Sequence, residues 1–96
     1  MHLEIITPET KIFKGEAKAV LLPGLDGFFQ VLNGHAPIIS GLNKGSVKVE
    51  MSAPIEVDEK MARWIRKDTT DQNVIHIEIN GGVMEMLNDN IIVLAE

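Results

Sequence analysis

The sequence predicts an all-β domain, a flattened sandwich or barrel of about eight to ten short strands. Two observations lead to this prediction. Apolar and polar residues alternate with period two over several segments, and small clusters of Gly, Asn, Asp and Pro separate these segments. Successive side chains of a strand point to opposite faces, so the alternation indicates strands with one buried face, and the clusters indicate turns. With 96 residues, we expect residues 1–96 to form a single domain with one core.

Alternation is clearest in residues 47–51 and 75–79, where the second segment places Ile at each inward position. Such β-branched residues fit a pleated, half-buried surface. Turn signals divide the rest of the chain, and the predicted strands are residues 2–7, 11–15, 17–22, 28–32, 37–42, 45–52, 73–80, 82–87 and 90–95. The turn signals include residues 23–24, 26–27, 33–34, 43–45, 81–82 and 88–90.

Residues 53–72 interrupt the alternation and contain both arginines and the only Trp. Met61, Trp64 and Ile65 have the i, i+3, i+4 spacing of one helical face, with Asp58 as a candidate N-cap. This insertion is therefore either a short amphipathic helix or an extended hairpin. We favour packing of its apolar stripe over a sheet edge, and the alternative is that Met61, Trp64 and Ile65 dock a partner.

Residues 82–87 carry apolar side chains on both faces of one predicted strand: Val83, Met84, Met86 and Leu87. Such a strand is either buried on both sides or exposed until a partner covers it. We favour burial on both sides.

Charge and composition exclude several functions. A net charge of -5 opposes binding to a phosphate backbone, so we expect no nucleic-acid partner. The absence of cysteine excludes disulfides, thiolate metal sites and a Cys nucleophile. No apolar run approaches the ~20 residues of a membrane span, so we expect no direct span.

No catalytic or cofactor motif stands out. His76 and Glu78 share one strand face and are candidate metal ligands, but a third ligand at recognisable spacing is missing, which favours a solvated face. Residues 24–27 lie between two predicted strands and indicate a hairpin turn rather than a phosphate loop. The serines lack the context of a nucleophile elbow. We therefore expect a non-catalytic protein without metal or cofactor.

Three ordered motifs resemble those of one family. Residues 22–37 read LPGLDGFFQVLNGHAP and continue through an apolar stretch to Gly45; residues 81–85 supply a double Gly, and residues 90–95 a closing strand. Together they resemble the N-terminal β domain of the epsilon subunit of F-type ATP synthases. The family's flattened β-sandwich agrees with the fold predicted from alternation and turns.

The resemblance implies a non-catalytic subunit of the rotor, or central stalk, that transmits rotation of the c ring through the γ subunit to ATP synthesis. It also implies a single copy in a hetero-oligomeric complex on the cytoplasmic face of the bacterial inner membrane. The family pattern assigns the c-ring contact to Asp26, Gly27 and Phe28, and the γ contact to His35, Ala36 and Pro37. For His35 the alternative is a turn residue that hydrogen-bonds its own backbone, and both interpretations stay open.

Some features depart from the family. Gln30 and Phe28 stand where members often have Gly and a polar residue, and the insertion replaces a short hairpin. Many members continue into two inhibitory C-terminal helices, whereas this sequence stops at Glu96. The resemblance therefore implies a subunit that couples rotation without inhibition by C-terminal helices.

Two other functions remain as alternatives. A free-standing β-sandwich module that binds a peptide or small ligand would share the fold. A metal-dependent enzyme that uses His76 and Glu78 is more distant.

Overall fold

The computed structural model describes residues 1–96 and contains ten β-strands and one 3₁₀-helix of three residues. The strands are β1 (His2–Ile6), β2 (Lys11–Glu16), β3 (Ala19–Gly24), β4 (Gly27–Leu32), β5 (Ile38–Leu42), β6 (Gly45–Glu50), β7 (Ile65–Lys67), β8 (Val74–Ile79), β9 (Gly82–Leu87) and β10 (Asn90–Ala95). All nine predicted strands are confirmed, and β7 is an addition within the insertion. No helix has the length and apolar character needed to cross a membrane.

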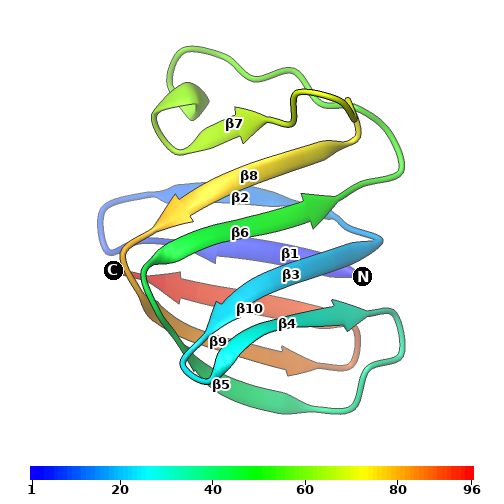
Figure 1. The fold of residues 1–96 in the computed structure, drawn as a ribbon, viewed down its shortest axis with the longest axis vertical. Coiled ribbons are helices and arrows are strands. Elements are labelled where there is room, and N and C mark those ends of the chain that lie inside the picture. The colour runs from blue at the N-terminus through cyan, green and yellow to red at the C-terminus, as the bar shows by residue number, and fades with distance from the viewer.

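The strands form two five-stranded layers, which confirms the flattened sandwich (Figure 1). One layer has the order β2-β1-β10-β9-β5, and the other has the order β4-β3-β6-β8-β7. Every pair is antiparallel except β1 with β10. The layers meet along the ladder at a single pair, Gly24 of β3 with Leu42 of β5. The sandwich is thus continuous on one side and open on the other, where β2 and β7 are the edge strands.

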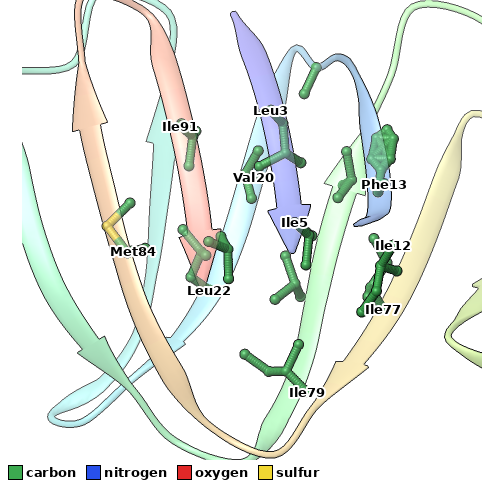
Figure 2. Close-up of a cluster of buried hydrophobic side chains, with 14 of the residues drawn as sticks. Leu3, Ile5, Ile12, Phe13, Val20, Leu22, Ile77, Ile79, Met84 and Ile91 are labelled. Carbon is green, nitrogen blue, oxygen red and sulfur yellow. The ribbon is translucent and has the colours of Figure 1, made fainter. Parts of the chain in front are cut away.

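The core lies between the layers and is filled by the inward side chains of both. Figure 2 shows Leu3 and Ile5 of β1 and Val20 and Leu22 of β3 among the side chains of this core. All four side chains are fully buried. Complete burial of one such side chain stabilises the fold by roughly 1.5–3 kcal/mol. A cluster of 21 buried residues extends through the whole sandwich, so no second core forms.

Strand β3 runs further than predicted, because it includes Pro23 and Gly24, where the sequence indicated a turn. The turn lies instead at Leu25 and Asp26, and β3 pairs with β6 only as far as Leu21. Pro23 therefore lies beyond the end of that pairing and costs the ladder no hydrogen bond. The predicted hairpin over residues 24–27 is confirmed.

The insertion contains helical and extended structure in succession, so neither a helix nor a hairpin alone describes it. Its helix spans only Met61–Arg63 with Lys60 at the N-cap position, and the candidate N-cap Asp58 lies two residues earlier, where its Oδ1 accepts the Met61 N–H at 2.9 Å. Ile65 then enters β7 and pairs with Ile77 of β8. Extension of the sheet by β7 satisfies more backbone groups than one further helical turn would, because β8 otherwise presents an open edge.

The apolar side chains of the insertion point towards the sandwich, as we favoured. Ile65 is 2% exposed and belongs to the core cluster, and Met61 and Trp64 are half-buried against it. Docking of a partner by Met61, Trp64 and Ile65 stays a prediction. Ile65 has almost no free surface to offer for it.

The turn between β7 and β8 is organised around the carboxylate of Asp68. Its Oδ1 lies 2.7 Å from Nε2 of His76, and its Oδ2 accepts the N–H groups of Thr70 at 3.1 Å and Asp71 at 3.0 Å. The hydrogen bond from His76, followed by those from Thr70 and Asp71, holds the pKa of Asp68 well below its usual range.

His76 therefore contacts Asp68, while Glu78 forms an ion pair with Arg66 at 3.6 Å. No group of three or more metal-ligating side chains comes together in the structure. The two candidate metal ligands thus have different partners on the same strand face.

We predict that Gly82→Ala destabilises the fold by about 3 kcal/mol, since Gly82 has φ +145° and an added Cβ would meet the carbonyl oxygen of Leu94. Gly34→Ala is the matched control, with positive φ but no atom within 4 Å of an added Cβ, and should cost about 1 kcal/mol. Urea denaturation measures both. If both variants lost the same free energy of unfolding, the contact with Leu94 would have no role in the effect.

We also predict that Asp68→Asn lowers the free energy of unfolding at pH 7, but that the difference from the unsubstituted chain shrinks below about pH 4. Because the folded-state pKa is lowered, the carboxylate contributes fully above its unfolded pKa and loses this contribution as the pH falls towards the folded value. Urea denaturation from pH 7 to pH 2.5 provides the comparison. Asp26→Asn is the control and should leave the free energy of unfolding at pH 7 unchanged, because the exposed carboxylate of Asp26 makes no hydrogen bond or ion pair.

Candidate partner-binding surface

The outer face of β5, β9 and β10 presents large apolar side chains to solvent. Inward positions of these strands belong to the core, so the alternate positions point outwards. The exposed apolar side chains are Ile39 (73% exposed), Val83 (46%), Leu87 (48%), Ile92 (41%) and Leu94 (57%). We call these five residues the outer apolar face.

Cross-strand pairing makes this face continuous. Leu94 of β10 lies opposite Val83 of β9, and Ile92 lies opposite Glu85, which in turn lies opposite Ile39 of β5. Side chains opposite each other on the same face of a sheet lie within contact range of one another. Glu85 is thus a carboxylate surrounded by apolar neighbours.

Leu25 extends this surface to the β3–β4 turn. A Cβ built on Gly41 would lie only 2.7 Å from Cδ1 of Leu25, so Leu25 packs directly over the backbone of β5. A larger residue at position 41 would displace the Leu25 side chain. Leu25 is itself 62% exposed, which makes it an apolar bridge between the turn and the sheet.

Two open clefts flank β5 and share Ile38 and Ile39. The lining of one consists of Pro37, Ile38, Ile39, Glu85, Met86 and Leu87. The lining of the other consists of residues 24–29 and 38–41. The segments that the family pattern assigns to partners therefore adjoin the same strand from opposite sides.

The residues predicted to contact the c ring lie at the tip of the β3–β4 hairpin. Asp26, Gly27 and Phe28 are all exposed, and Phe28 keeps 63% of its surface free although it is an aromatic side chain. Gly27 has φ +121°, which suits glycine in this tight turn. Their contact with a c ring stays a prediction.

The residues predicted to contact γ lie in the exposed loop between β4 and β5. His35 Nδ1 lies 2.6 Å from the carbonyl oxygen of Ala36 and donates to it when the proton is on Nδ1. The loop is further held by the Gly34 N–H, which donates to Asp89 of the β9–β10 turn at 2.8 Å. His35 therefore does bond its own backbone, and its γ contact stays a prediction.

Of these loop residues, only Pro37 reaches the clefts, where it lies near Ile39 and Leu87. The insertion residues Met61, Trp64 and Ile65 line neither cleft. The structure thus brings one predicted γ residue together with the outer apolar face and leaves the insertion out.

Burial of β9 on both sides, which we favoured, is wrong. Met84 and Met86 are buried, but Val83 and Leu87 are exposed because no third layer covers β9. The second interpretation, a strand exposed until a partner covers it, fits this arrangement. Ile92 and Leu94 were not among the predicted surface residues, although residues 91–94 are apolar on both faces and carry the same signal.

The sequence of residues 1–62 matches the family described as "ATP synthase, Delta/Epsilon chain, beta-sandwich domain". The ATP synthase epsilon chain of Chlorobium limicola is 33% identical over 94 residues, which cover 98% of this chain and 86% of that protein. The ATP synthase epsilon chain of Bordetella parapertussis is 32% identical over 96 residues, and this chain spans 56% of it.

The fold also resembles a solved structure, one chain of the central stalk and c ring of the mitochondrial ATP synthase of Tetrahymena thermophila. The TM-score is 0.65 with 12% sequence identity, and the match covers 98% of this chain and 63% of that chain. This likeness concerns the fold alone. The sequence matches carry the assignment: the chain belongs to the ATP synthase delta/epsilon chain family and forms its β-sandwich domain.

Proposed function

We propose that this chain is a non-catalytic rotor subunit of an F-type ATP synthase, which couples rotation of the c ring through γ to ATP synthesis. Family membership and the relatives named ATP synthase epsilon chain support this proposal. The structural observation that carries it is the outer apolar face, a surface suited to being covered by a partner. We place the chain at the cytoplasmic face of the membrane as a peripheral part of that complex.

The outer apolar face is the proposed docking site for the γ subunit. Contiguous exposed apolar surface of this kind marks interfaces, and the buried centre of a protein interface is typically apolar with a polar rim. Here Ile39 and Leu87 line the same cleft as Pro37, which joins the face to the γ segment assigned by resemblance. Glu4 and Asn90 stand at its border, opposite Ile92 and Leu87 respectively.

The hairpin tip at residues 26–28 is the proposed contact with the c ring. It projects from β3 and β4, whereas the outer apolar face belongs to the other layer. Phe28 supplies an exposed aromatic side chain for an apolar contact. One rigid sandwich thus carries two contact surfaces, which adjoin at Leu25 and at the cleft that Phe28 and Ile39 both line.

Transmission of torque between these two surfaces requires a stiff domain and no catalytic residues. The core includes at least one side chain from every strand and is filled from both layers. Close-packed interiors of this kind transmit strain with little compression. Torque applied at one surface would therefore reach the other through the sandwich itself.

We predict that Ile39→Glu weakens binding to the γ subunit of the same ATP synthase by at least about tenfold. The charge would be buried in an apolar contact beside Glu85, while the free domain should stay folded because Ile39 is 73% exposed. Titration calorimetry with purified γ measures the affinity. Thr69→Glu is the control, since it adds the same charge in the exposed β7–β8 turn and should leave the affinity unchanged. Equal affinities of the two variants would exclude the outer apolar face as the γ site.

His35→Ala should weaken γ binding by about threefold to tenfold and leave the isolated domain folded. Its hydrogen bond to Ala36 lies at the surface, so its loss has little effect on the core. Calorimetry gives the affinity, and NMR spectra of the free variant report the fold. Loss of the fold would favour a purely structural role of His35, and an unchanged affinity would remove it from the interface.

A further inference from the structure

A cleft of about 470 Å³ separates the start of β2 from the insertion. One wall is formed by Thr10, Lys11 and Ile12, and the other includes Lys60, Arg63 and Trp64. The walls belong to opposite layers of the sandwich, because β2 is an edge of one layer and the insertion leads into β7 at the edge of the other. The cleft thus lies at the open side of the sandwich, away from the Gly24–Leu42 connection.

Positive charge exceeds negative charge in the lining of this cleft. Lys60 and Arg63 form no ion pair, and Lys11 lies 3.4 Å from Glu4, a carboxylate that it shares with Lys14 at 3.9 Å. Three cations therefore face one lining carboxylate, Asp58, in a chain whose net charge is -5.

Asp58 offsets only one of these three cations. Its Oδ1 accepts the N–H of Met61 at 2.9 Å, a hydrogen bond that orients the carboxylate and leaves its charge in place. The lining therefore keeps an excess of positive charge that is available to an external anion.

The arginine is oriented in a way that suits an oxyanion. The guanidinium carbon of Arg63 lies 4.8 Å from the centre of the Trp64 ring, in the range of a cation–π contact. Such a contact restrains the guanidinium plane while its N–H groups can still donate in pairs to phosphate-like oxygens. The hydroxyl of Thr10 makes no hydrogen bond within the protein and adds a further donor.

We propose that this cleft binds a small, multivalent phosphate-class anion from solution, held by Lys60 and Arg63 on the insertion and by Lys11 and Thr10 on β2 and the turn before it. The bound anion links β2 to the insertion that leads into β7, across the open side of the sandwich. Binding therefore stabilises the fold, because a ligand that binds only the folded state shifts the unfolding equilibrium. This site is independent of the γ and c-ring contacts, whose residues it does not include.

Titration with inorganic pyrophosphate tests the proposal on the whole chain. The indole N–H signal of Trp64 should shift in a saturable manner in NMR spectra, and Tm should rise by at least about 4 °C at ten times the dissociation constant. The double variant Lys60→Gln, Arg63→Gln should bind at least about tenfold more weakly. The control Arg66→Gln removes a cation paired with Glu78 outside the cleft and should bind like the unsubstituted chain.

Lys60→Gln alone serves as a second variant should the double variant fail to fold, because Lys60 is exposed. The absence of a saturable shift up to about 10 mM pyrophosphate would overturn the proposal. Equal weakening by Arg66→Gln would also overturn it, since it would indicate a general charge effect. Tighter binding of an acidic hexapeptide than of pyrophosphate would replace the small anion with a protein partner.

Discussion

Burial of two inner sheet faces against each other is the interaction on which this structure depends, because a chain of this size has only one core to stabilise it. Every strand with regular alternation contributes to that core, as β6 illustrates with Val47 and Val49 both buried. Once the inner faces are buried against each other, folding requires no apolar side chains on the outer faces. Apolar side chains on an outer face therefore require a separate explanation, and the outer apolar face is where the chain departs most clearly from what folding alone demands.

The open side of the sandwich explains the insertion in the same terms. Two sheets that pair where β3 meets β5, at Gly24 and Leu42, expose the core at the opposite edge, between β2 and β7. Residues 53–72 lie over that edge with Met61 and Trp64 packed on the core, and their charged side chains remain at the surface. One segment thus both covers the core and carries positive charge. Its apolar side chains pack inwards, and its Lys and Arg side chains point to solvent.

Local sequence signals predicted most of the fold. Alternation located β6 and β8, and turn residues separated the other strands, because both signals act over a few neighbouring residues. The errors arose where distant partners decide the outcome. Ile65 joins β7 because β8 offers a free edge, and Pro23 stays in β3 because β6 has ended, and neither circumstance is visible locally.

The candidate surface was predictable only in part for the same reason. The hairpin tip and the loop at His35 stood out through family motifs, whereas the continuity of Ile39 with Leu94 depends on the register of β5 against the β9–β10 hairpin, which is far from β5 in the sequence. Apolar residues on both faces of β9 indicated either burial on both sides or a surface for a partner. Only the absence of a third layer in the structure distinguishes these two cases.

The most direct test is a cryo-EM structure of the assembled ATP synthase that contains this chain. The account predicts that γ covers Ile39, Val83 and Leu94 and that the hairpin tip at Phe28 rests on the c ring. An outer apolar face that points to solvent in the assembled complex, with γ bound elsewhere on the sandwich, would contradict it.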